Sequence, residues 1–275
     1  MLASPKSYVS LYASMAFQLK NDTMKNHTKL ILLLLFLFFS TTNYAQFKIP
    51  PKLQKLVNAY PDFIQSANEN ELIWKDGTVI QYDDGKNKTF NELLNDPDIE
   101  DMMFQDYTMG ANWSSPPDVN FEPGRIRYEP LFLKMYGSSA KEVERNLAPV
   151  SWLPKSGGGT VYITSVNGAD KQLKKVSDEL DELPAEYKKY ILNTAGTFYW
   201  RVIKNTNRLS MHSFGIAIDI NTSYSNYWEW EKNIKYKNKI PIEIVEIFEK
   251  YGYIWGGKWY HYDTMHFEYR PELLN

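Results

Sequence analysis

Cysteine is absent from the sequence, which excludes disulfide bonds, thiolate zinc sites and cysteine nucleophiles. An excess of charge is also missing, because 31 basic and 33 acidic residues leave a net charge of -2. This balance lacks the electrostatic footprint of nucleic-acid binding, so no nucleic-acid partner is expected. Aromatic residues, by contrast, are frequent, with 20 tyrosines and 8 tryptophans among 275 residues. They suit a packed core or a groove that holds a ligand.

The sequence has only one long apolar run, the ten residues 30–39, and it follows the basic stretch Met24–Lys29. Ten residues are too few to span about 30 Å of hydrocarbon as a helix, so the run is typical of a signal peptide. We expect translation to start at Met24, cleavage after Ala45, and export to the periplasm or the cell exterior. No lasting membrane anchor is expected, because a lipoprotein anchor would need a cysteine.

The rest of the chain predicts an extension over residues 46–110 and a main domain over residues 111–275, divided where Gly, Pro, Ser and Asn become dense. Helices are predicted at 52–60, 141–147, 169–183 and 241–251, and strands at 71–82, 160–165, 192–203 and after 253. The glycines at 157–159 are interpreted as a hairpin tip, because no Gly-Lys-Ser/Thr follows as in a phosphate-binding loop.

Two short segments hold the residues suited to chemistry: Ser-Met-His-Ser-Phe-Gly-Ile-Ala-Ile-Asp-Ile-Asn at 210–221 and Asp-Thr-Met-His-Phe-Glu at 263–268. Alternation along 215–221 predicts a strand whose isoleucines face the core while Asp219 projects from the opposite face. His212 precedes this strand, and Gly215 permits a bend that returns the imidazole towards Asp219. Asp263 and His266 lie three residues apart, close enough to face the same cavity.

Three protein ligands and one open position form a catalytic zinc site, whereas four protein ligands form a structural one. We therefore assign His212, Asp219 and His266 as Zn²⁺ ligands and Asp263 as the general base. A single buried histidine is more often a hydrogen-bonded core residue than a ligand. The concentration favours a site, because the three histidines that follow residue 45, namely His212, His261 and His266, all lie in or beside these two segments.

His261 is interpreted as a supporting residue of the metal site, with a plain surface position as the alternative. Ser210 either bonds the metal ligands or caps a turn. It is not a nucleophile, because no His–Asp pair remains to activate it.

The pattern Ser210-x-His-x-x-Gly-x-Ala-x-Asp219 followed by Asp263-x-x-His-Phe-Glu268 resembles bacterial and phage zinc metallopeptidases that cut peptidoglycan stem peptides. These are the VanX/VanY-type D-alanyl-D-alanine dipeptidases and carboxypeptidases and the L-alanyl-D-glutamate endopeptidases. The resemblance covers about residues 125–272. It implies an α+β fold with a small antiparallel sheet flanked by helices and zinc at the sheet edge, as in the hedgehog/DD-peptidase fold. It also implies the same three ligands and the same base.

The family further uses an upstream arginine to hold the substrate and polarise the scissile carbonyl, as a guanidinium can. Arg201 is our first choice, although it lies nearer to His212 in sequence than the arginine of relatives does. Arg125 and Arg127 therefore remain candidates, and a strand-face ion pair is the alternative for Arg201.

The resemblance implies a zinc-dependent D-alanyl-D-alanine carboxypeptidase, or a related L,D-endopeptidase, with peptidoglycan stem peptides as substrates. Two other hypotheses stay open. One is a non-catalytic binding module, since the hedgehog signalling domain resembles this fold and keeps zinc while serving recognition. The other is a structural zinc site with His261 as the fourth ligand. The sequence does not select the peptide bond or the oligomeric state.

Overall fold

The computed structural model describes residues 48–274, which lie within one compact unit. The predicted leader and the start of the extension fall outside the described residues. The α-helices are α3 (Pro51–Ala59), α4 (Phe90–Asn95), α5 (Ile99–Met103), α6 (Glu129–Tyr136), α7 (Ala140–Glu144), α8 (Ala169–Asp181), α9 (Ala185–Ile191) and α10 (Ile242–Lys250). The strands are β1 (Ile64–Ala67), β2 (Glu71–Trp74), β3 (Val79–Gln81), β4 (Leu147–Ser151), β5 (Thr160–Thr164), β6 (Ala217–Asp219), β7 (Tyr253–Trp255) and β8 (His266–Tyr269).

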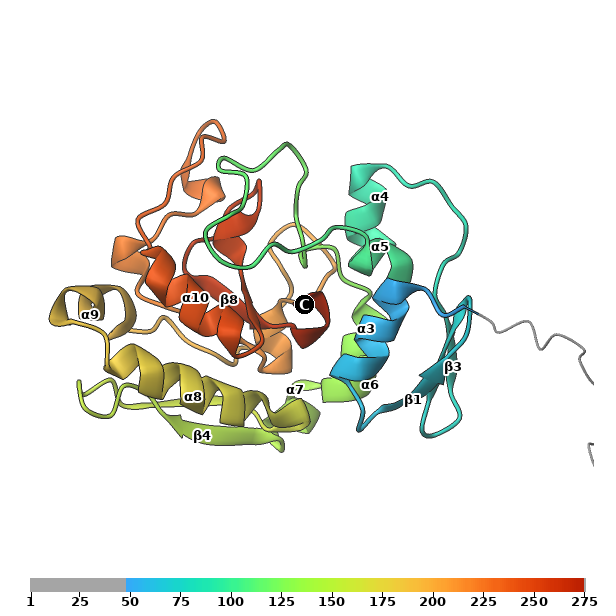
Figure 1. Cartoon of the computed structure of the whole chain (residues 1–275), viewed down its shortest axis with the longest axis horizontal. Helices are drawn as coiled ribbons and strands as arrows, with labels where there is room; N and C mark the ends of the chain where they lie inside the picture. The colour runs from blue at the N-terminus through green and yellow to red at the C-terminus, as the bar shows by residue number, and fades with distance from the viewer. Residues whose placement is uncertain (1–47, 275) are drawn as a thin grey trace, which may run out of the picture. The chain divides into compact units, whose positions relative to one another are not determined.

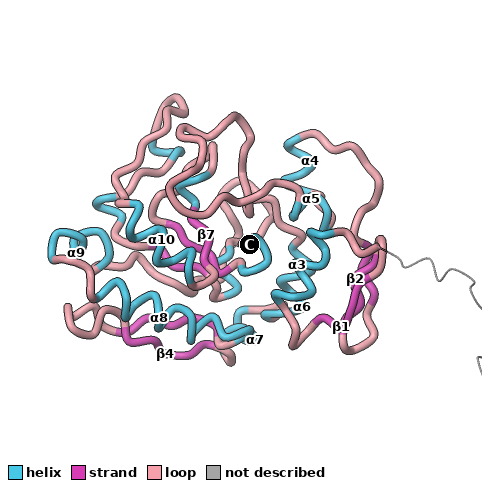
Figure 2. The backbone as a smooth tube through the Cα atoms, viewed as in Figure 1, coloured by secondary structure: helices cyan, strands magenta, loops and turns pink. Residues whose placement is uncertain are grey.

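The strands form three small antiparallel sheets, ordered β1-β2-β3, β4-β5 and β6-β8-β7. Helix α8 packs on the β4-β5 hairpin and against α10 (Figure 1), and α10 packs on β7 (Figure 2). Figure 2 shows long loops between these elements, above all between α5 and α6. Mixed helices and antiparallel sheets agree with the expected α+β class.

One hydrophobic core runs through the described residues, because the extension and the main domain both contribute buried side chains to it. Its members include Leu53, Tyr60 and Trp74 from the extension and Phe132, Trp152, Leu173, Phe248 and Phe267 from later elements. In α8 the buried Leu173, Val176 and Leu180 recur every three or four residues, as an amphipathic helix requires. Among residues 48–274, no helix is both long and apolar enough to cross a membrane.

Most predicted elements agree with the structure within a few residues. The helices predicted at 52–60, 141–147, 169–183 and 241–251 correspond to α3, α7, α8 and α10, and residues 152–159 form the tip of the β4-β5 hairpin. Ser139 caps α7 with its side chain, which accepts a hydrogen bond from the Glu142 N–H.

The strand predicted at 192–203 is wrong, since this segment is irregular and makes only isolated bridges, Gly196 to Asp219 and Val202 to Leu209. Its residues Tyr199 and Val202 are 67% and 54% exposed, so the aromatic and β-branched run does not pack as a sheet. Its backbone instead bonds the turn that carries His212, for example from the Tyr199 N–H to the His212 carbonyl at 3.2 Å.

Candidate metal centre

His212 lies in the 3-10 turn η2 (Met211–Phe214), which connects the irregular segment to β6. The Ser210 hydroxyl caps this turn by accepting from the His212 N–H at 3.4 Å, and the Gly215 N–H closes it on the His212 carbonyl at 3.1 Å. Gly215 ends the turn in the left-handed region, with φ of 65°, which an L side chain adopts only with strain. The bend expected at Gly215 is therefore present, and Ser210 acts as a cap.

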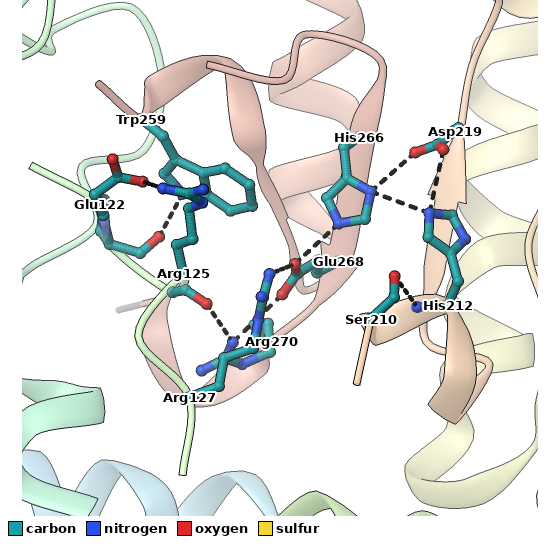
Figure 3. A network of polar contacts seen from close by, with 12 residues as sticks. Glu122, Arg125, Arg127, Ser210, His212, Asp219, Trp259, His266, Glu268 and Arg270 are labelled. Atoms are coloured by element: carbon teal, nitrogen blue, oxygen red, sulfur yellow. Dashed lines mark hydrogen bonds and ion pairs between the residues drawn. The ribbon is translucent and has the colours of Figure 1, made fainter. Parts of the chain in front are cut away.

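Asp219 and His266 are brought together by the register of the β6-β8 pair, in which they lie directly opposite each other. His266 Nδ1 lies 2.8 Å from Asp219 Oδ1, and His212 Nε2 lies 3.2 Å from both His266 Nδ1 and Asp219 Oδ2. Figure 3 shows the three side chains converging from η2, β6 and β8. They form the one mixed His/Asp group that could hold a metal among the described residues.

The outer nitrogen of each imidazole is held by another group, which fixes the nitrogen that faces the centre. His212 Nδ1 lies 2.5 Å from the Thr197 carbonyl, and His266 Nε2 lies 2.9 Å from Glu268 Oε1. Metal-binding histidines commonly show such contacts, because the second hydrogen bond sets the tautomer and the ring orientation. Two imidazoles and a carboxylate, each oriented in this way, fit the donor set of a three-ligand zinc site.

The electrostatics of the cluster favour a bound cation. Burial alone would raise the pKa of Asp219, but His212 and His266 lower it well below its usual value. Burial would lower the pKa of His266, but hydrogen bonds with Asp219 and Glu268 raise it to about 10. The carboxylates thus stabilise a proton at the position where a zinc ion would place its charge.

Glu268 links the cluster to the partly buried Arg127 and the fully buried Arg270. Its Oε1 pairs with Arg127 as well as with His266, and its Oε2 lies 3.4 Å from Arg270 Nη1. Burial would raise the pKa of Glu268, but Arg127 and His266 lower it to about 2. Glu268 is therefore a carboxylate that both orients His266 and raises its basicity.

Asp263 lies in the loop between β7 and β8, where its N–H donates to the Gly256 carbonyl and its carbonyl accepts from the His266 N–H. It also lies opposite Tyr227 in an isolated β-bridge. Its Oδ1 is buried and has no hydrogen-bond partner among the described residues. Burial first, and then the nearby Asp219 charge, raise the pKa of Asp263 to about 7, while both ligand histidines act in the opposite direction. A buried carboxyl group with a pKa near 7 and a free oxygen is suited to accept a proton from water.

His261 lies outside the ligand group. Its Nδ1 pairs with Glu122, its backbone N–H donates to the same carboxylate at 3.1 Å, and its ring packs between Trp228 and Phe90. Phe90 comes from the extension, so the extension contributes to the surroundings of this residue. The group that could hold a metal consists of His212, Asp219 and His266 and does not include His261. It therefore gives no support to a structural site with His261 as the fourth ligand.

The three candidate arginines differ in their surroundings. Arg201 is exposed and forms no ion pair within residues 48–274. Arg127 is bound to Glu268 and lies over the Trp259 ring. Arg125 pairs with Glu122 at 2.9 Å, lies over the Trp228 ring, and is the arginine whose charge acts on Asp263.

Some supporting groups were not predicted, namely the Thr197 carbonyl, Glu122 and the role of Glu268. A signal for Glu268 was present, because residues two apart in a strand share a face and Glu268 follows His266 at that spacing. Thr197 and Glu122 lie in irregular segments, so no periodic pattern in the sequence predicts that the Thr197 carbonyl contacts His212 or that the Glu122 carboxylate contacts His261.

A His-Asp-His cluster beside an aspartate with a buried, unpaired carboxylate oxygen defines a candidate hydrolytic metal centre in this α+β fold. Residues 204–269, which contain the three proposed ligands and Asp263, match the family model described as D-alanyl-D-alanine carboxypeptidase. The match confirms the resemblance to this family of zinc-dependent peptidases over these residues. Comparison with curated proteins gave no match, and neither did comparison with solved structures.

Proposed function

We propose that this protein is a zinc-dependent peptidase of peptidoglycan stem peptides that acts as a D-alanyl-D-alanine carboxypeptidase. The observation that carries the proposal is the convergence of His212, Asp219 and His266 next to the buried carboxyl group of Asp263. A zinc ion held by the three side chains would polarise the scissile carbonyl and lower the pKa of water. The hedgehog/DD-peptidase fold belongs to the same proposal.

In this scheme the residues around the three proposed ligands have separate tasks. Asp263 accepts the proton of the attacking water and passes it to the leaving amine. Arg125, whose charge reaches Asp263, replaces Arg201 as our first candidate to hold the scissile carbonyl oxygen. His261, fixed by Glu122, lies beside Trp228 and supports the same side of the centre.

We also propose that the protein is exported. Support comes from the basic and apolar pattern of residues 24–45, and from the location of peptidoglycan outside the cytoplasmic membrane. The leader lies outside the described residues, so N-terminal sequencing of the secreted product is the direct test. A mature chain that begins at Gln46 is expected.

The activity test uses zinc-loaded mature protein, purified muropeptides and mass spectrometry. We expect pentapeptide stems to lose one D-alanine, and Asp263→Asn to lower kcat by about 10²- to 10⁴-fold because the general base is lost. Zinc content should stay unchanged, since Asp263 is not in the ligand group. Asp62→Asn, an exposed change in the extension, is the matched control.

Other outcomes decide between the alternatives. Cleavage inside the stem would replace carboxypeptidase with endopeptidase. The absence of cleavage by zinc-loaded protein on every muropeptide, with binding that Asp263→Asn leaves intact, would contradict the enzyme and favour a binding module.

A further inference from the structure

Next to the metal centre lies a cleft of about 760 Å³ that the proposed chemistry does not use. Three segments line it: residues 95–97 between α4 and α5, residues 127–130 at the start of α6, and residues 205–208 just before the His212 turn. The first segment belongs to the extension and the other two belong to the proposed peptidase domain. The volume is large enough for part of a peptide.

The cleft contains one guanidinium group without a partner. Arg208 is half-buried, forms no ion pair with any residue that the structure describes, and has a buried Nε without a hydrogen bond. Arg127, which also lines the cleft, has a buried Nε without a partner, and its Nη2 pairs with Glu268. The two Nη groups of Arg208 are not buried and form no hydrogen bond with any described residue, so a ligand in the cleft can supply their acceptor.

The charges around Arg208 favour the binding of an anion there. Burial and the charges of Arg127 and Arg125 lower the pKa of the Arg208 guanidinium to about 10. A cation held near like charges in a partly desolvated place is costly unless an anion joins it.

The two acidic residues of the cleft do not supply this anion. Glu129 accepts a hydrogen bond from the Leu209 N–H at 2.7 Å. Its charge and that of Glu122 act to raise the pKa of Arg208, but neither residue forms an ion pair with Arg208 among the described residues. Asp96 also lines the cleft but is exposed, and its charge acts on Lys86.

The arginines are also connected to the metal centre. Arg208 lies two residues before Ser210, the cap of the turn that carries His212. Arg127 contacts Glu268, which holds His266. An anion bound between Arg127 and Arg208 would therefore lie close to the centre without contacting the metal ligands.

We propose that Arg208, with Arg127, forms a subsite for a free carboxylate of the stem peptide. A guanidinium fork matches the planar carboxylate and binds it through paired hydrogen bonds. Stem peptides carry such carboxylates at the C-terminus and on the D-glutamyl residue. The subsite rests on the proposed function for its choice of ligand, and it would make the cleft a determinant of substrate specificity.

The test measures peptide binding by calorimetry in the zinc-loaded Asp263→Asn background, so that cleavage is not needed. The probes are a stem pentapeptide ending in D-Ala-D-Ala and two analogues, one with the D-glutamyl carboxylate and one with the C-terminal carboxylate replaced by an amide. We expect one of the amides to raise Kd by about 10- to 100-fold, because a charge-assisted bond is lost. Arg208→Gln should raise the Kd of the free peptide by a similar factor and add nothing to the loss seen with that amide.

Arg145→Gln, an exposed change at the end of α7, is the matched control and should leave Kd unchanged. The subsite is refuted if the unmodified peptide and both amide peptides bind with the same Kd. It is also refuted if the increases in Kd caused by the amide and by Arg208→Gln multiply when the two changes are combined. The amide arms need no arginine variant, so misfolding of Arg208→Gln cannot hide the answer. If binding depends on Arg208 but the unsubstituted protein, which keeps Asp263, cleaves no peptide, the subsite is retained and the peptidase is refuted. If the unsubstituted protein cleaves the peptide but binding does not depend on Arg208, the peptidase is retained and the subsite is refuted.

Discussion

At the scale of single residues, Glu268 combines two tasks that are usually separate. Its carboxylate orients His266 through Nε2, and it is the ion-pair partner of Arg127 among the described residues. The side chain is fully buried, so no solvent can replace either contact. Loss of its charge should therefore weaken both metal binding and the fold.

Glu268→Gln keeps the shape of the side chain and removes the charge. We expect zinc affinity to fall by about 10- to 100-fold, because the amide supports the His266 imidazole less strongly. Competition with a chromophoric chelator measures this affinity. Glu246→Gln, on the exposed side of α10, should have no effect, and equal affinities for the two variants would show that Glu268 does not act on the metal.

The sequence predicted the three residues of the His/Asp group better than it predicted the residues around them. His212, Asp219 and His266 follow from residue chemistry that few other positions in the chain offer. The substrate-binding arginine is harder to predict from the sequence, because Arg125, Arg127 and Arg201 have the same chemistry and differ only in their position in the fold. Arg125 is distinguished by its ion pair with Glu122, which also holds His261, and no local pattern encodes this placement.

At the scale of elements, η2 and the irregular segment before it form the site more than any long strand does. The predicted strand at 192–203 followed from β propensity, which reflects packing on a pleated surface. Here that surface is missing, because the segment bonds the His212 turn and leaves Tyr199 exposed. Thr197 can offer its carbonyl to His212 as a result, so the failed prediction coincides with a support of the metal centre.

Gly215→Ala tests the turn. A Cβ at this position would be strained at φ of 65° and would lie 2.8 Å from Leu147 Cδ2. We expect a loss of about 2–4 kcal/mol in the free energy of unfolding, from left-handed strain and overpacking together. Zinc affinity should also fall, because the turn positions His212. Denaturant unfolding and chelator competition measure the two effects.

Gly77→Ala is the matched control for this change. Gly77 also has a positive φ, of 84°, but a Cβ there would meet no atom within 4 Å. It should cost only the strain, about 1–2 kcal/mol, and leave zinc affinity unchanged. If both variants lose the same stability and bind zinc equally well, the close packing at Gly215 has no role.

At the scale of the whole molecule, a buried polar chain joins the extension to the metal centre. The Tyr60 hydroxyl, at the end of α3, donates to Glu272 at 2.6 Å, and Glu272 pairs with Arg270. Arg270 reaches Glu268, which holds His266. The division at residue 110 remains a prediction about sequence organisation, whereas the core and this chain cross it.

Tyr60→Phe removes one hydroxyl from this chain and leaves the ring in the core. We expect the free energy of unfolding to fall by about 1.5–3 kcal/mol and Tm by about 3–12 °C, because Glu272 loses a buried donor. Unfolding should remain one transition by far-UV circular dichroism and by tryptophan fluorescence, since Trp74 lies in the extension and Trp255 beside the centre. Tyr82→Phe is the control, because Tyr82 is buried in the same extension and its hydroxyl makes no hydrogen bond within residues 48–274. Two separate transitions would show that the extension folds independently of the residues around His266. Equal Tm values for the two variants would show that the Tyr60–Glu272 hydrogen bond does not add to the stability.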